Sequence, residues 1–135
     1  MELTTAMLAD SAQTSDGKLY VLGGQWDQLN AAAVPVIHPA MAVVVVLRLD
    51  AEEAAQPHRL LVELLFGGEP VGPRAAGQVA SHDSAAGAVS TAGAVSFANV
   101  TFEHAGHYEW VVRVDDDEVG RLPLDVLVET PAAVS

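Results

Sequence analysis

Hydrophobic residues alternate with polar residues in three separate stretches of the chain. Residues 60, 62, 64 and 66 are apolar in the first stretch, residues 108 to 114 repeat this spacing, and residues 122 to 128 repeat it again. The charged residues stand at intervening positions. A period of two is the signature of a strand with one buried face, so these stretches predict strands of an antiparallel sheet.

A fourth stretch, residues 42–47 with the sequence AVVVVL, is apolar on both faces. Four consecutive β-branched residues favour a strand. Burial of both faces predicts a central strand covered by a second sheet. The first ten residues also have the character of a strand, with Leu3, Met7 and Leu8 among threonines and alanines.

Turn sequences separate the predicted strands. Asp16 and Gly17 form a strong hairpin dipeptide, and glycines 67 and 68 follow the strand at 59–66. Residues 71–93 are rich in Gly, Ala and Ser, which predicts a loop with one edge strand at 77–81. Residues 50–57 contain helix formers, but Pro57 closes any helix within two turns.

The spacing of strands and turns predicts an all-β protein, an antiparallel β-sandwich of seven to eight strands. Residues 1–129 would form this single domain, and residues 130–135 a flexible C-terminal tail.

The apolar phase changes within residues 94–102. Val95 and Phe97 share one parity, whereas Val100 and Phe102 share the other. A slip of one residue inverts the faces of a strand, which predicts a β-bulge near Ala98 and Asn99. Alternatively, the segment splits and only one half joins the sheet.

The sequence HAGHYEW at 104–110 has the form of a tyrosine corner, a feature of immunoglobulin-like sandwiches. In that corner a tyrosine hydroxyl bonds to backbone a few residues upstream. We therefore expect Tyr108 to make this bond, and Trp110 to fill the core position that a half-cystine occupies in other domains. Together with the strand count, this predicts an immunoglobulin-like β-sandwich.

Charge and composition exclude several partners. The 135-residue chain has a formal net charge of −12, and its six Lys and Arg residues are scattered singly. Nucleic acid and anionic membranes need clustered cations, so we expect neither as a partner. The chain has no cysteine, which excludes thiol chemistry and suits the cytoplasm. No signal peptide is visible, and the longest apolar run is too short to span a bilayer.

The glycine pair Gly23 and Gly24 follows a strand and raises the question of a phosphate-binding turn. Neither a helix nor a lysine follows them, as the phosphate motifs require. We expect a bulge or a close backbone approach instead. Trp26, just beyond, is expected to cap the rim of the core, the alternative being an exposed residue that recognises a partner.

Two groups of residues are candidates for metal binding. His104 and His107 have the spacing H-x-x-H, and Glu103 or His82 would have to complete the site. The acidic cluster Asp115, Asp116, Asp117 and Glu118 has the ligand type that calcium prefers. It lacks the ligand spacing, however, and would need help from residues 50–53. The alternative for both groups is a solvated turn.

No arrangement for catalysis emerges. Ser81, His82 and Asp83 are adjacent, whereas the members of a triad meet from separate segments. Glu63 and Glu109 alternate outward on strands and are expected to face solvent. We predict no catalytic residue and no cofactor.

The chain resembles an uncharacterised bacterial family, a domain of unknown function. The resemblance rests on the segments MLADSA (7–12), GKLYVLGG (17–24), VIHPAMAVVV (36–45), HRLLVEL (58–64) and AGHYEW (105–110). It covers most of the chain except 67–92. It implies a β-sandwich and brings no activity, cofactor or catalytic residue.

These observations favour a non-catalytic protein-interaction or structural module. The partner would be another protein or a second copy bound through an edge strand. One alternative is a calcium- or carbohydrate-binding sandwich that uses the acidic loops. A second alternative is a hydrolase whose site the sequence does not reveal.

Overall fold

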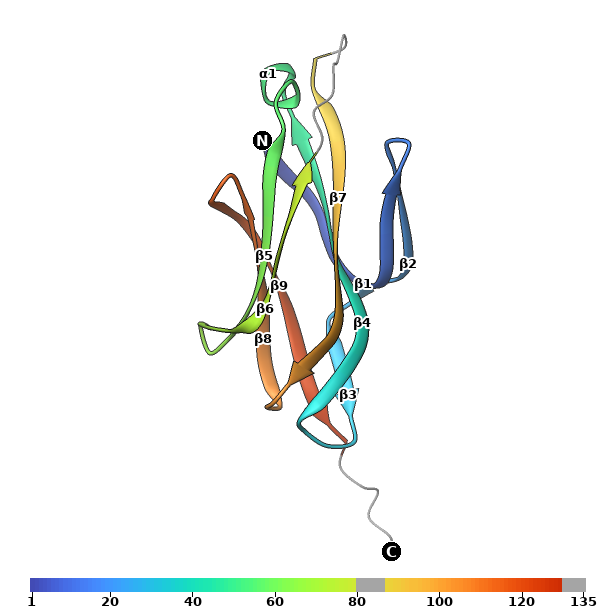
Figure 1. The fold of residues 1–135 in the computed structure, drawn as a ribbon, viewed down its shortest axis with the longest axis vertical. Helices are drawn as coiled ribbons and strands as arrows, with labels where there is room; N and C mark the ends of the chain where they lie inside the picture. The colour runs from blue at the N-terminus through green and yellow to red at the C-terminus, as the bar shows by residue number, and fades with distance from the viewer. Residues whose placement is uncertain (80–86, 130–135) are drawn as a thin grey trace, which may run out of the picture.

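The computed structural model describes residues 1–79 and 87–129 and contains two packed β-sheets (Figure 1). The strands are β1 (Glu2–Ser15), β2 (Lys18–Trp26), β3 (Gln28–Ala31), β4 (Val36–Leu49), β5 (His58–Phe66), β6 (Glu69–Val79), β7 (Val89–Phe102), β8 (Gly106–Val114) and β9 (Asp117–Val128). One short helix, α1 (Ala51–Ala54), joins β4 to β5. The all-β sandwich is therefore confirmed, with nine strands among the described residues instead of seven to eight.

The first sheet has the strand order β2-β1-β4-β7, and the second has the order β3-β9-β8-β5-β6. Strand β4 lies inside the first sheet, where Val43, Val44 and Val45 are fully buried. This confirms the central strand predicted from AVVVVL. Trp110 and Phe102 are the largest fully buried side chains of the core between the sheets.

One strand pair departs from the antiparallel prediction. Strand β3 pairs in parallel with β9. The chain leaves the first sheet after β2 and joins the edge of the second sheet at once, where the Asp125 N–H donates to the carbonyl of Asp27 at 2.9 Å. Because β3 arrives from the opposite sheet and not from a hairpin, no tight turn forces it to run against β9.

The hairpin predicted at Asp16 and Gly17 is confirmed. Both residues have positive φ angles, 52° and 72°, as a type I′ turn requires. Asp115 and Asp116 repeat this conformation between β8 and β9, with φ angles of 51° and 71°.

The prediction of a β-bulge near Ala98 and Asn99 is wrong, because the strand changes faces there without a shift in register. Strands β4 and β7 keep one register from Val36↔Phe102 to Leu49↔Val89, so neither strand carries an extra residue. Instead, both strands change faces together: β7 at Asn99, where φ is 52°, and β4 at Pro39 opposite it. The alternative of a split segment is also wrong, since β7 is continuous.

The loop predicted for residues 71–93 is likewise wrong over much of its length. Residues 71–79 belong to β6, and β7 begins at Val89. Strand propensity is low here, but β5 is strongly apolar and supplies a long partner for β6. Pairing with a neighbour therefore overrides local preference. The last residues of the predicted edge strand at 77–81, and the predicted tail at 130–135, lie outside the described residues.

Helix α1 is a single capped turn. The Asp50 carboxylate accepts from the Glu53 N–H at 2.8 Å, and the Glu53 carboxylate accepts from the Asp50 N–H at 3.0 Å, which is a capping box. Among the described residues, no helix is long and apolar enough to cross a membrane.

Tyr108 makes the corner hydrogen bonds. Its hydroxyl donates to the His104 carbonyl at 2.8 Å and accepts from the His104 N–H at 3.2 Å. The ring is buried and meets Phe102 edge-on, with centroids 5.1 Å apart. The corner thus holds the connection between β7 and β8 against the core.

We predict that Tyr108→Phe lowers the free energy of unfolding by about 1–3 kcal/mol, because two backbone groups lose a buried partner. Urea unfolding measures this loss. Tyr20→Phe, at a half-exposed tyrosine, is the control and should change stability little. A Tyr108→Phe protein as stable as the parent would contradict a stabilising corner.

Candidate functional site

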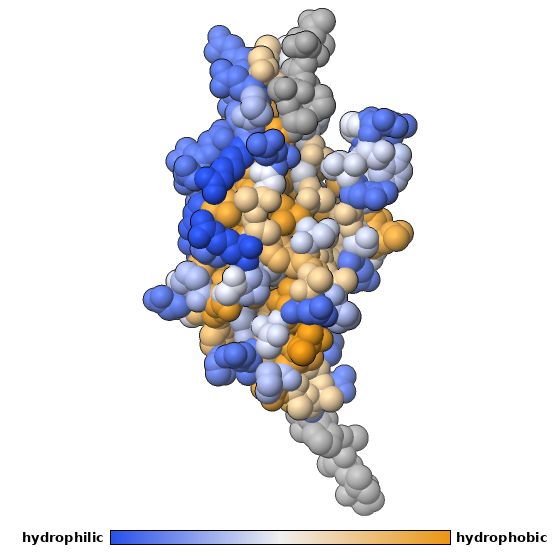
Figure 2. Space-filling view, in the orientation of Figure 1, coloured by the Kyte–Doolittle hydropathy of each residue, from blue (hydrophilic) through white to orange (hydrophobic). Residues whose placement is uncertain are grey.

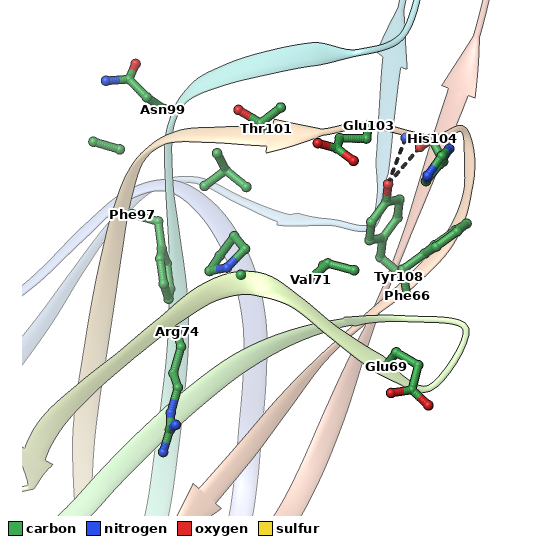
Figure 3. A pocket seen from close by; sticks show the side chains of 14 residues that line it. Phe66, Glu69, Val71, Arg74, Phe97, Asn99, Thr101, Glu103, His104 and Tyr108 are labelled. Atoms are coloured by element: carbon green, nitrogen blue, oxygen red, sulfur yellow. Dashed lines mark hydrogen bonds between the residues drawn. The ribbon is translucent and has the colours of Figure 1, made fainter.

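A recess lies between β6 and β7, the outer strands of the two sheets on one side of the sandwich. We call it the β6–β7 groove. Its volume is about 710 Å³. The groove is lined by Phe66, Glu69, Val71, Gly72, Pro73, Arg74, Phe97, Ala98, Asn99, Val100, Thr101, Glu103, His104 and Tyr108 (Figure 3).

The groove exists because the two edge strands separate along their length. Near one end they pack closely, since a Cβ atom on Gly77 would lie only 3.8 Å from a methyl of Val95. Further along, β6 bulges away from β5: the pairing shifts from Glu63↔Arg74 to Leu65↔Pro70. On the opposite wall, β7 changes faces at Asn99. The bulge and the face change lie across from each other and leave the space between.

Aromatic side chains form the inner part of the groove. The ring of Phe66 lies 4.6 Å from that of Tyr108 and stacks on the imidazole of His104 at 5.4 Å, measured between centroids. Phe97 lies 4.6 Å from Trp110. These contacts fix the rings, so the apolar surface is preformed. Figure 2 shows apolar surface down the middle of this face, with hydrophilic residues along its margin.

The charged residues of the groove differ in whether they have an ion-pair partner. Arg74 lies 3.9 Å from the carboxylate of Glu63, which partly neutralises it. Glu69 on the β6 side and Glu103 on the β7 side have no ion pair within the described part of the chain (Figure 3). The groove therefore combines an apolar interior with two carboxylates at its walls.

The structure does not bring His104 and His107 together on a metal. His104 stacks on Phe66 in the groove, whereas the Nδ1 of His107 lies 2.7 Å from a carboxylate oxygen of Asp125. Within residues 1–79 and 87–129, no three His, Cys, Asp or Glu side chains are grouped to hold a metal ion. His82 lies outside the described residues.

Residues 115–118, which we call the acidic turn, pair largely with cationic side chains of the protein itself. The Asp115 carboxylate accepts from the backbone N–H of Arg59 at 2.9 Å and contacts Nδ1 of His58 at 2.5 Å. Glu118 pairs with Arg121 at 2.9 Å, and Asp116 lies 4.0 Å from Arg59. Asp117 begins β9. The four carboxylates thus have different surroundings and do not form one ligand set.

His58 connects the acidic turn to helix α1, the segment expected to assist it. Its Nε2 lies 2.6 Å from the carbonyl of Glu53, and its Nδ1 faces Asp115. Both neighbours are acceptors, so both ring nitrogens must donate, and the ring is a buried imidazolium. The hydrogen bond with Asp115 raises the pKa of His58 above 6.5 and lowers the pKa of Asp115 below 3.8.

We predict that this pair stabilises the fold at neutral and mildly acidic pH. Because the folded pKa of His58 is raised, its contribution is complete below pH 6.5 and is lost as pH rises through the folded value. The contribution of Asp115 is lost as pH falls below 3.8. Urea unfolding across pH should therefore show stability falling above pH 6.5.

The control is Asp115→Asn, which keeps the shape and removes the charge. It should flatten the decline above pH 6.5. An undiminished decline in this variant would assign the pH dependence to other groups.

The glycine pair produces a bend, as expected. The pairing of β1 with β2 shifts between Leu8 and Ala9, and Gly23 has a φ angle of 62°. A Cβ atom on Gly23 would meet the Asp10 side chain, which would have to move, and the positive φ angle favours glycine. Trp26 is half-buried, packs against the core and contacts the ring of His38 at 5.7 Å.

The enzyme candidates are not gathered into a site. Glu63 pairs with Arg113 at 3.5 Å, and Glu109 pairs with Arg121 at 3.6 Å. Ser81, His82 and Asp83 lie outside the described residues.

A family model matches residues 4–127, nearly the whole folded part of the chain. Its description is a family of unknown function, DUF6941. The chain belongs to the DUF6941 family. The uncharacterised family expected from the sequence is thereby confirmed, and membership brings no activity with it. The comparison with curated proteins found no match for this DUF6941 chain.

Solved structures give only distant likenesses. A β-glucosidase from Listeria innocua in complex with glucose has a TM-score of 0.48 at 12% identity, over 93% of this chain and 16% of the glucosidase. An alkylpurine DNA glycosylase from Pseudomonas fluorescens bound to DNA has a TM-score of 0.43 at 8% identity, over 91% of this chain and 30% of the glycosylase. These TM-scores are too low to inform function.

Sequence reasoning missed the groove of this DUF6941 chain. Val71 to Arg74 fell in the predicted loop, and Phe97 and Val100 were considered only for the apolar phase of their strand. The signals were the change of apolar phase at Asn99 and the Gly72–Pro73 pair, which is typical of a break in an edge strand. Nothing in the sequence showed that these two features would face each other.

Proposed function

We propose that this protein is a non-catalytic interaction module that binds an extended segment of another protein in the β6–β7 groove. The observation that carries the proposal is the divergence of two outer strands over a preformed apolar interior. Outer strands have unpaired backbone N–H and C=O groups. A groove between them offers hydrogen bonds to the main chain of a peptide and an apolar site for its side chains.

This mode of binding is strand addition. The peptide's main chain supplies affinity by pairing with a sheet edge, and alternate side chains enter the pocket and supply specificity. A volume of about 710 Å³ is within the usual range of binding sites. Phe66 and Phe97, which are only partly buried, would contact the apolar side chains of the segment.

The charges indicate which segment fits. Glu69 and Glu103 lie on opposite walls without internal partners among the described residues, and the whole chain carries a net charge of −12. An extended segment with Lys or Arg on either side of apolar residues is complementary to this arrangement. An acidic segment would meet repulsion.

The fold supports this role. The tyrosine corner and the two sheets, one of them built on β5, β8 and β9, favour an immunoglobulin-like arrangement, which we infer for the family. Such sandwiches present edge strands and loops to partners. The lack of cysteine supports the cytoplasm as the compartment.

Titration with synthetic peptides tests the proposal. The probes are short peptides of alternating valine and threonine, flanked by lysines in one and by glutamates in the other. We expect the lysine peptide to shift the backbone amide NMR signals of Ala98 to Thr101 and of Val71, Gly72 and Arg74. The glutamate peptide should shift them much less. Shifts elsewhere, or none, would contradict the groove as the binding site.

Charge reversal at both walls tests the specificity. We expect Glu69→Lys with Glu103→Lys to weaken binding of the lysine peptide by about tenfold, since two ion pairs of about 0.2–1 kcal/mol each are lost and repulsion is added. Glu2→Lys with Glu52→Lys makes the same charge change near α1 and is the matched control. Equal affinity in both double variants would contradict the assigned walls.

A further inference from the structure

The opposite edge of the first sheet, formed by β2, has exposed apolar residues. Tyr20 is 50% exposed and Leu22 is 72% exposed. Strand β2 is outermost in the order β2-β1-β4-β7. Figure 1 shows the β1–β2 hairpin standing away from the body of the sandwich. This edge is therefore accessible and lies on the far side of the sheet from the β6–β7 groove.

The hairpin register shows which backbone groups of β2 face outward. Ser15 pairs with Lys18 beside the two-residue turn, and Ser11 pairs with Leu22. In such a hairpin the pair next to the turn is hydrogen-bonded, and hydrogen-bonded pairs then alternate along the strands. Lys18, Tyr20 and Leu22 thus bond to β1. The N–H and C=O groups of Leu19 and Val21 point away from the sheet.

Residues 18–22 of this edge have few of the usual protections, because the bend of the strand lies beyond them at Gly23 and Gly24. Natural proteins block such edges with proline, short strands or several charges. Residues 18–22 contain no proline and one charge, that of Lys18. The edge can therefore accept a strand, and the question is which strand fits.

A second copy of β2 fits this edge. With a two-fold axis at Val21 and the strands antiparallel, the outward groups of Val21 bond to those of Val21 in the second copy. Tyr20 then lies opposite Leu22 of the second copy, and Leu22 opposite Tyr20. The two most exposed apolar side chains of the edge cover each other in both directions, an aromatic–aliphatic pairing that stabilises sheets.

The charges also permit a second copy at this place. The net charge of −12 makes most of the surface repel another copy. Between residues 11 and 26, however, the charged residues are Asp16 and Lys18, which cancel. In the register with Val21 on the axis, Lys18 lies opposite Gly24, so no like charges meet.

We propose that the chain forms a two-fold symmetric dimer through β2. The two four-stranded sheets join into one continuous sheet, and the interface is isologous. Each groove stays open at the outer end of this sheet, so dimerisation presents two grooves to a partner. The dimer does not depend on the proposed function of the groove.

Light scattering coupled to size exclusion tests the dimer. The parent protein should have the mass of two chains, and Leu22→Lys should have the mass of one. Ile37→Lys is the matched control, because Ile37 is also exposed, at 62%, but lies on the inner strand β4. This variant should remain dimeric. A monomeric parent, or a dimer that survives Leu22→Lys, would overturn the proposal.

Cysteine cross-linking tests the register. The chain has no cysteine, so Val21→Cys introduces a single thiol. Cα atoms of a hydrogen-bonded antiparallel pair are about 5.5 Å apart, a separation that suits a disulfide. Mild oxidation should convert Val21→Cys to a covalent dimer much faster than Ile37→Cys. Equal rates would overturn the pairing at Val21.

Discussion

The structure depends on the burial of both faces of β4. A strand with apolar residues at consecutive positions is stable only inside a sheet that is itself covered. Strands β1 and β7 therefore flank β4, and the second sheet packs across Val43 and Val45. Because β1 and β4 are the inner strands, β2 and β7 are the outer strands of the first sheet. Both surfaces for which we propose binding thus follow from the position of β4.

The coupled change of faces at Pro39 and Asn99 shapes the groove. Pro39 has no N–H to donate, so the ladder can break at this place at little cost. Asn99 adopts a left-handed conformation that asparagine tolerates better than most residues. Because both strands change together, Val100 and Phe102 stay in the core and the register of β4 with β7 is unbroken. An ordinary bulge would have shifted the register of every later pair.

Within the part of the chain that the structure describes, cationic side chains pair with many of the carboxylates in the second sheet and its turns, but not with the two glutamates of the groove. His58, Arg59, Arg113 and Arg121 lie among the carboxylates of the second sheet and its turns. The acidic turn thereby becomes part of the framework, with the imidazolium of His58 between Asp115 and the end of α1. Glu69 and Glu103 receive no such partner among the described residues. The carboxylates most evident in the sequence are therefore structural, and the less evident ones belong to the candidate site.

The sequence alone determined most strands, the Asp16–Gly17 turn and the corner at Tyr108, because period-two alternation and turn chemistry are local properties. Only the tertiary structure decided the strand partners. Strand β6 forms because β5 offers a partner, β3 runs parallel to β9 because the chain crosses between sheets, and the irregularities at Gly72 and Asn99 face each other across the groove. Pairing between distant segments depends on how two sheets pack, and no local pattern contains that information.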